Sequence, residues 1–112
     1  YTLFMMLVGK QRTVHGIDAP AVTGHEMFER AYRVQMNTLE QMVFALAAMW
    51  VCGWFFSPMI AAILGGVFII GRFIYWRSYM SDPKKRGPGM IIGFLGNMGM
   101  VGCGLWGVIG QL

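Results

Sequence analysis

Residues 42–71 read MVFALAAMWVCGWFFSPMIAAILGGVFIIG and contain no Asp, Glu, Lys, Arg or His. A helix needs roughly 20 apolar residues to cross the hydrocarbon core of a bilayer, so this stretch is too long for one crossing. Ser57-Pro58 interrupts it, and proline is favoured in the first turn of a helix because its missing N–H would be unpaired there anyway. We interpret the stretch as the end of one membrane span, a tight turn and the beginning of the next.

The rest of the chain fits the same class of protein. Residues 87–112 also lack charged side chains, and charged residues make up 12% of the whole sequence, against roughly 25% in soluble domains. We therefore predict an all-α integral membrane four-helix bundle, one domain over residues 1–112, with spans at about 1–14, 26–56, 58–80 and 90–112. The first is too short to cross a bilayer, so we expect it to be the end of a longer helix.

The basic residues indicate a topology. Lys and Arg gather in the segments around residues 10–33 and 72–86, whereas the turn at Ser57-Pro58 has none. The positive-inside rule then puts both basic connections in the cytoplasm. Because no basic stripe alternates with exposed aromatics, the net charge of +4 does not indicate a nucleic-acid partner. Cys52 and Cys103 lie in apolar spans without metal-ligand spacing, so we expect small buried hydrophobes and no metal site.

Polar side chains inside the second and third predicted spans are the candidates for a functional site, because such groups are costly in a bilayer. Spacings of three and four place each set on one helix face: Arg30, Arg33, Asn37 and Glu40 on the second, and Arg72, Tyr75 and Tyr79 on the third. If these antiparallel helices are neighbours, the two faces form a pocket. Guanidiniums clamp carboxylates, a carboxylate takes an ammonium and phenols donate hydrogen bonds, so the pocket suits a small zwitterion with several carboxylates.

Simpler interpretations stay open at this stage. Arg33 and Glu40 would then pair with each other, and the two tyrosines would be interfacial residues. Arg77 and Lys84 are expected to contact anionic lipid. The last span is rich in glycine, which permits close helix packing in membranes or leaves a smooth groove for lipid; its glycines are Gly93, Gly96, Gly99, Gly102, Gly104, Gly107 and Gly110.

Two segments carry a resemblance to a known family. Residues 28–40, FERAYRVQMNTLE, and residues 71–79, GRFIYWRSY, with the basic run 84–86, resemble the signature segments of the MAPEG family, the membrane-associated proteins in eicosanoid and glutathione metabolism. The similarity is to the branch that holds microsomal glutathione transferase 2 and leukotriene C synthase. Together the two segments and the span pattern cover nearly the whole chain.

This resemblance implies a homotrimer of four-span protomers that binds glutathione at the cytoplasmic side and attacks lipophilic electrophiles or lipid hydroperoxides, with no metal. Arg86 would be the catalytic residue that stabilises the thiolate. The implied glutathione-binding residues are Arg12, Arg33, Gln35, Asn37, Glu40, Arg72, Tyr75 and Tyr79, with Gln35 reaching the ligand of a neighbouring protomer. Gln41 departs from the pattern, since leukotriene C synthase has a tyrosine there. The absent cytoplasmic tail and the Met-rich spans favour a bacterial inner membrane over the endoplasmic reticulum.

Two other functions compete with a glutathione transferase or peroxidase. One is a non-catalytic lipid-binding scaffold of the same family, which would lack a working glutathione site. The other is a small multidrug transporter, in which we would expect the embedded carboxylate in the first helix. In this chain the embedded carboxylate, Glu40, lies in the second predicted span beside Arg33 and Asn37.

Overall fold

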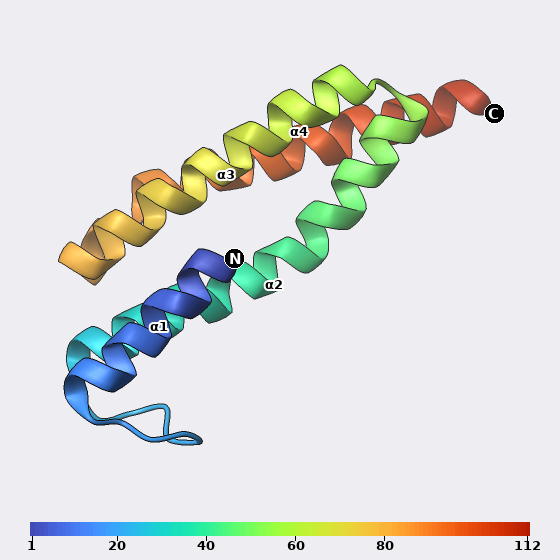
Figure 1. Cartoon of the computed structure of the whole chain (residues 1–112). Helices are drawn as coiled ribbons and strands as arrows, with labels where there is room; N and C mark the ends of the chain where they lie inside the picture. Colours follow the sequence, from blue (N-terminus) through green and yellow to red (C-terminus); the bar gives the residue numbers. More distant parts are fainter.

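The computed structural model describes all 112 residues and is entirely helical. Four α-helices and one short 3₁₀ helix follow one another along the chain (Figure 1): α1 Thr2–His15, α2 Glu26–Phe55, α3 Pro58–Ser81, η1 Pro83–Lys85 and α4 Gly87–Gln111. The all-helical prediction is confirmed.

Turn and capping residues set the ends of the first three helices. Gly16 ends α1 with φ of 64°, a left-handed conformation that glycine adopts at little cost. The Nδ1 atom of His25 accepts a hydrogen bond from the Met27 N–H at 3.1 Å and caps α2. Ser57 caps α3 in the same way, since its Oγ accepts a hydrogen bond from the Ile60 N–H at 3.3 Å. The first residue of α3 is Pro58.

The last helix begins at Gly87, three residues before the expected start at Met90. Asp82 ends α3 and accepts a hydrogen bond from the Lys84 N–H at 3.0 Å, which starts the η1 turn. Pro88 then lies in the first turn of α4, where a proline needs no hydrogen-bond partner. The connection between α3 and α4 is therefore shorter and more ordered than a loop over residues 82–89.

The helices form an elongated bundle of 55 × 26 × 17 Å. In Figure 1, α3 and α4 run side by side along their length, and α1 covers only the first half of α2. Glycine makes the close approach of α3 and α4 possible. A Cβ atom at Gly71 would lie 2.5 Å from the Gly93 nitrogen, and one at Gly96 would lie 2.9 Å from the Leu64 carbonyl oxygen. These glycines therefore serve helix packing, one of the two roles expected of them.

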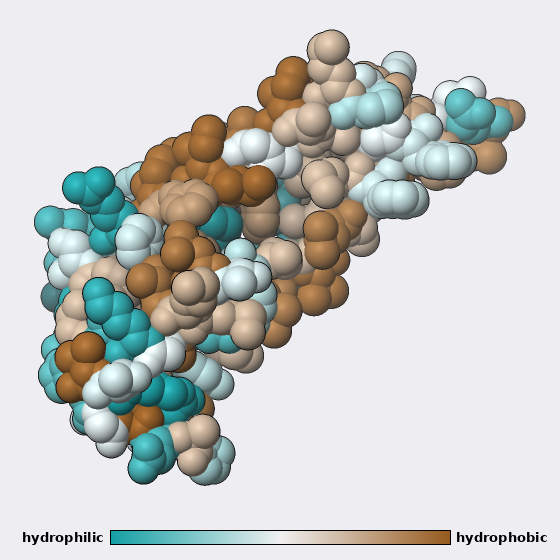
Figure 2. Space-filling view, viewed as in Figure 1, coloured by the Kyte–Doolittle hydropathy of each residue, from teal (hydrophilic) through white to brown (hydrophobic).

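Three segments are long and apolar enough to cross a membrane: Glu26–Phe55, Pro58–Ser81 and Pro83–Gln111. At 14 residues, α1 is shorter than a crossing requires. Large apolar side chains cover the outside of the long helices, among them the exposed Trp50, Trp54 and Trp106. Polar residues gather at the end that holds the α1–α2 and α3–α4 connections (Figure 2). This distribution is that of a protein whose apolar middle faces lipid.

Candidate functional site

The candidate site is built around Arg72, a guanidinium from α3 that is 5% exposed. Its Nη2 donates to Asn37 Oδ1 at 2.8 Å and to Thr38 Oγ1 at 2.9 Å, and its Nε donates to Thr38 Oγ1 at 3.1 Å. Both acceptors lie on α2, one turn before the helix enters its fully apolar half. The facing of α2 and α3 that the sequence suggested therefore occurs, and one side chain bridges the two helices.

Arg72 has no carboxylate partner. The ion pairs of this chain are Arg30–Glu26 and Arg33–Glu40, and neither involves Arg72. Its charge rests on two neutral acceptors and on the ring of Tyr75, whose centroid lies 4.3 Å from the guanidinium carbon. Burying an unpaired charge costs several kcal/mol, so this guanidinium is a strong partner for an anionic group that reaches it.

The two tyrosines of α3 extend the site toward the polar end of the bundle. The rings of Tyr75 and Tyr79 stack with centroids 5.4 Å apart, and Tyr75 is 2% exposed. Tyr75 thus contacts both the Arg72 guanidinium and the Tyr79 ring. Arg86, which follows the η1 turn, is exposed and donates to the Pro83 carbonyl at 3.4 Å.

Arg33 and Glu40 form an ion pair at 3.1 Å, with 48% and 54% of their side chains exposed. This is the simpler pairing that the sequence left open for them. Because half-exposed pairs contribute little to stability, both groups remain available to a charged ligand. Glu40 is neither buried nor isolated, which differs from the membrane-embedded carboxylate that a multidrug transporter would be expected to use.

Arg12 and Gln35 make their hydrogen bonds outside this group within one chain. Arg12 Nη1 donates to the Ala21 carbonyl at 2.8 Å, and its guanidinium lies 4.7 Å from the centre of the Phe28 ring. Gln35 Nε2 donates to the Tyr1 hydroxyl at 3.1 Å. Direct contacts therefore join Asn37, Arg72, Tyr75 and Tyr79 in one group and Arg33 with Glu40 in a second. Arg86 makes its hydrogen bond to Pro83, and Arg12 and Gln35 make theirs to Ala21 and Tyr1.

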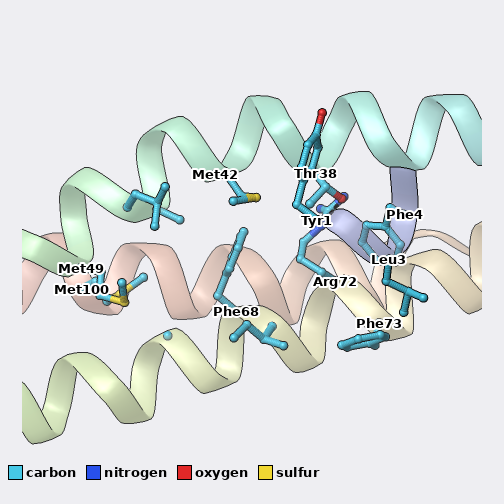
Figure 3. Close-up of a pocket in the computed structure, with 14 residues that line it drawn as sticks. Tyr1, Leu3, Phe4, Thr38, Met42, Met49, Phe68, Arg72, Phe73 and Met100 are labelled. Carbon is cyan, nitrogen blue, oxygen red and sulfur yellow. Dashed lines mark hydrogen bonds between the residues drawn. The ribbon is translucent and has the colours of Figure 1, made fainter. Parts of the chain in front are cut away.

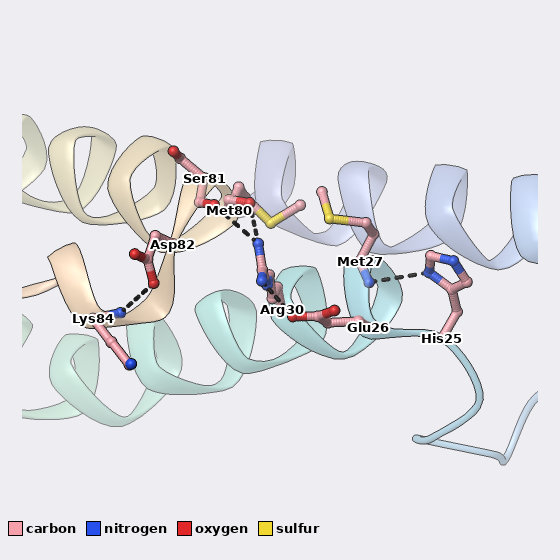
Figure 4. Close-up of polar contacts among 8 residues, drawn as sticks. All are labelled: His25, Glu26, Met27, Arg30, Met80, Ser81, Asp82 and Lys84. Atoms are coloured by element: carbon pink, nitrogen blue, oxygen red, sulfur yellow. Dashed lines mark hydrogen bonds and ion pairs between the residues drawn. The ribbon is translucent and has the colours of Figure 1, made fainter.

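Arg30 has a structural role that its place on one helix face with Arg33 did not predict. It pairs with Glu26, and its Nη1 donates to the carbonyls of Met80 and Ser81 at 2.8 and 3.1 Å. Figure 4 shows this guanidinium between α2 and the end of α3. The contact satisfies carbonyls that a helix end leaves unpaired. It fixes the start of the connection that carries Arg86.

Three polar residues of the second and fourth helices were missed or undervalued. The helix spacing gave no signal for Thr38 beyond its place in the motif FERAYRVQMNTLE, although it accepts two of the three hydrogen bonds from Arg72. Gln41 lines a small cavity of about 70 Å³ together with Asn37 and Arg72. Asn97, on α4, is 1% exposed and its Oδ1 has no protein partner. A lone amide in the glycine-rich helix was the available signal for Asn97, because polar groups in spans mark sites.

A larger cavity of about 250 Å³ lies between the helices and also reaches Arg72. Eleven of its fourteen lining residues are hydrophobic. Figure 3 shows Thr38 and Arg72 at one part of the cavity and Met49 and Met100 at the other. The same guanidinium therefore faces a small polar space and a larger apolar one.

Comparison with known proteins gives consistent matches. Residues 1–106 match the MAPEG family. An uncharacterised protein of Synechocystis is 41% identical over 112 residues, which is the whole chain and 82% of that protein. Microsomal glutathione S-transferase 2 of Homo sapiens is 38% identical over 98 residues, or 88% of this chain and 64% of that enzyme. Leukotriene C4 synthase of Cavia porcellus is 35% identical over 83 residues, or 74% of this chain and 55% of that enzyme. The chain thus spans less than two thirds of the length of these two enzymes.

Proposed function

Because this chain belongs to the MAPEG family, an assignment that makes it an integral membrane protein, we propose that it is a membrane-bound glutathione transferase that also reduces lipid hydroperoxides. The observation that carries the proposal is the buried Arg72, held by neutral acceptors beside the stacked rings of Tyr75 and Tyr79, with the Arg33–Glu40 pair on the same helix as those acceptors. Such a group of donors suits a ligand with two carboxylates, an ammonium and a thiol. Glutathione has that composition, and the name of the relative microsomal glutathione S-transferase 2 links this family to it.

The donor set can be divided over the parts of glutathione. Arg72 and Arg33 hold carboxylates, Asn37 and Tyr79 supply further hydrogen bonds, and Glu40 takes the ammonium. For Glu40 this means exchanging Arg33 for the ligand, which costs little because the pair is half exposed. Gln41 contributes an amide in place of the phenol found in leukotriene C synthase.

We place the complete site in a homotrimer of four-span protomers. Arg12 lies on α1 and Gln35 contacts Tyr1, and neither is hydrogen-bonded to Arg72 of its own chain. Gln35 serves the ligand of a neighbouring protomer, and Arg12 is a further glutathione contact at the end of α1. The basic connections place the glutathione end in the cytoplasm, and the uncharacterised cyanobacterial relative favours a bacterial membrane.

The catalytic step needs the thiolate, which is the nucleophile. A cation within about 4–6 Å lowers a thiol pKa by roughly 1–3 units. At pH 7 about 3% of a thiol with a pKa near 8.5 is ionised, and about three quarters is ionised once that pKa has fallen by about 2 units. Arg86, exposed at the start of α4, is the cation that we assign to this role. The thiol proton leaves to water.

The thiolate sulfur then attacks an electrophile that arrives from the bilayer. With an epoxide, a C–S bond forms, the C–O bond breaks and the alkoxide takes a proton from water. With a hydroperoxide, the sulfur attacks the terminal oxygen, the O–O bond breaks and an alcohol leaves. The resulting glutathione sulfenic acid reacts with a second glutathione to give the disulfide and water.

The test is the ultraviolet absorbance of the glutathione thiolate on purified protein at neutral pH, comparing wild type, Arg86→Ala and Lys85→Ala. Lys85 is the matched control, since it is an exposed cation adjacent in sequence. We expect a thiolate signal in wild type and Lys85→Ala and its loss in Arg86→Ala. A folded wild-type protein without the signal would contradict the thiolate mechanism. The non-catalytic lipid-binding scaffold would then be the better function.

A further inference from the structure

Two histidines lie against each other where the connection between α1 and α2 begins and ends. They are the only histidines of the chain. His15 is the last residue of α1, and His25 is the N-cap of α2. Their rings are stacked, with centroids 3.6 Å apart and planes 10° apart. This histidine pair therefore holds together the two ends of the connection over residues 16–24.

A second contact of His25 defines the protonation state in which this arrangement is stable. Its Nδ1 accepts a hydrogen bond from the Met27 N–H at 3.1 Å (Figure 4). A ring nitrogen accepts only while it carries no proton, and both nitrogens of an imidazolium are donors. The cap of α2 is therefore complete when His25 is neutral, and it is lost as the pH falls through the titration of that ring.

The stack depends on the same titration. Two neutral imidazoles can lie face to face, whereas two imidazolium ions at this separation repel each other. No ion pair of the chain involves either ring. The doubly protonated pair therefore has no carboxylate at ion-pair distance to hold it together.

The charged groups on the surrounding elements are largely occupied elsewhere. Arg12 donates to the Ala21 carbonyl, Glu26 pairs with Arg30, and Asp82 accepts from the Lys84 N–H. The charged residues of the elements around the pair are Lys10 and Arg12 on α1, Asp18 in the connection, Glu26, Glu29 and Arg30 on α2, and Asp82 at the end of α3.

From these contacts we propose that the histidine pair is a pH-sensitive switch that opens the start of α2 in acid. An unperturbed imidazole titrates at about pH 6.5. Above that range the cap and the stack are both made. Below it the Met27 N–H has lost its acceptor and the two rings repel each other. The switch lies in the connection that the proposed topology places in the cytoplasm.

The first turn of α2 carries the effect toward the α3–α4 connection. Glu26 follows His25 directly and pairs with Arg30, whose Nη1 donates to the carbonyls of Met80 and Ser81. When the first turn of α2 frays, Glu26 no longer holds Arg30 in place. The segment after Ser81 then opens more often, and the importance of this step for Arg86 rests on the proposed function.

The experiment is hydrogen exchange of the full chain in phosphatidylcholine vesicles at about pH 5 and about pH 7.5, with labelling times matched to the intrinsic pH dependence of exchange. We expect the amides of residues 27–30 to exchange at least about fivefold faster in acid, which is the effect of one lost N-cap. A smaller increase is expected at residues 80–87. Equal protection at both pH values would overturn the proposal.

Two variants separate the cap from the stack. His25→Asn keeps a side-chain acceptor that is favoured at N-caps and does not titrate in this range, so it should keep the neutral-pH protection in acid. His15→Phe keeps an aromatic partner without a charge and should show a reduced acid effect, because only the cap is lost. An acid effect of wild-type size in His25→Asn would contradict the switch.

Carbon-13 NMR of protein labelled in histidine needs no variant, and only this pair gives a signal. The pH midpoint of exchange in the wild type should coincide with the ring titration. A midpoint near about pH 4, where carboxylates titrate, would assign the opening to Asp or Glu and overturn the proposal.

Neither measurement uses glutathione, so the two proposals can fail separately. Acid opening that follows the histidine titration, in a protein without a thiolate signal, would leave the switch standing and reject the proposed function. A thiolate signal in a protein whose exchange does not respond to acid would reject the switch and leave the proposed function standing.

Discussion

Replacing Thr38 by Val tests whether this hydroxyl positions the Arg72 guanidinium. Thr38 Oγ1 accepts hydrogen bonds from Nε at 3.1 Å and Nη2 at 2.9 Å, and the side chain is 2% exposed. Valine has nearly the same shape but no acceptor. After the change Nη2 keeps Asn37 Oδ1 at 2.8 Å, whereas Nε loses its only partner.

The size of the effect follows from these contacts. A hydrogen bond to a charged group contributes about 1.5–3 kcal/mol to the stability of soluble proteins. Side-chain hydrogen bonds between membrane helices contribute about 0.6 kcal/mol on average. Two bonds share one oxygen here, and a buried charged donor is left unsatisfied. We therefore expect Thr38→Val to lower the free energy of unfolding by about 2 kcal/mol. If Arg72 holds a carboxylate of glutathione, the same free energy corresponds to a roughly 30-fold loss of glutathione affinity.

Two matched variants control this experiment. Thr38→Ser keeps the hydroxyl and removes only the methyl group. Its free energy of unfolding should stay within about 0.5 kcal/mol of wild type. Thr13→Val removes an exposed hydroxyl that bonds only to the Gly9 carbonyl at 3.2 Å. The free energy of unfolding in mixed detergent and the glutathione dependence of the thiolate signal are measured for all three. If Thr38→Val matched Thr13→Val in both, the hydroxyl would not position the guanidinium.

Two further changes probe the frame around the site. Gly96→Ala should lower the free energy of unfolding by about 1–3 kcal/mol through overpacking, because a Cβ there would lie 2.9 Å from Phe68 N. Gly102→Ala is the control and should leave it unchanged, since a Cβ there would have nothing within 4 Å. Equal unfolding curves for the two variants in mixed detergent would contradict the close packing. Arg30→Gln should speed hydrogen exchange of the amides at 80–87 and weaken the thiolate signal, because it releases the Met80 and Ser81 carbonyls. The exposed Arg77→Gln is its control, and unchanged exchange in Arg30→Gln would show that the carbonyl contacts do not order the connection.

The helices were predictable because their signals are local. Charge-free stretches, Ser57-Pro58 and the Gly16 turn fix where the chain can be helical, and caps such as His25 act within three residues. The start of α4 was harder to predict from the sequence. Asp82 caps the η1 turn at Pro83–Lys85, and this turn occupies part of the segment that was expected to be a loop. Such a short turn has no periodicity to detect.

The site was predictable in its membership more than in its roles. Spacings of three and four put Asn37 and Arg72 on the right faces, and their contact followed from antiparallel packing. The role of Thr38 depends on where the Arg72 head group comes to rest, which no helix periodicity specifies. Likewise Arg30 shares the face of Arg33, yet its length and its position opposite the end of α3 give it the carbonyls of Met80 and Ser81 as partners.

The two cations of α2 and α3 at the centre of the site differ in a way that bears on ligand exchange. Arg33 is half exposed and already has the Glu40 carboxylate, so a ligand must displace or bridge an existing pair whose net worth is small. Arg72 is buried and has only neutral acceptors, so an anion that reaches it meets an uncompensated charge in a medium of low dielectric. Affinity should therefore be dominated by Arg72, whereas Arg33 and Glu40 discriminate between ligands by the sign and spacing of their outer charges. A zwitterion with two carboxylates uses both.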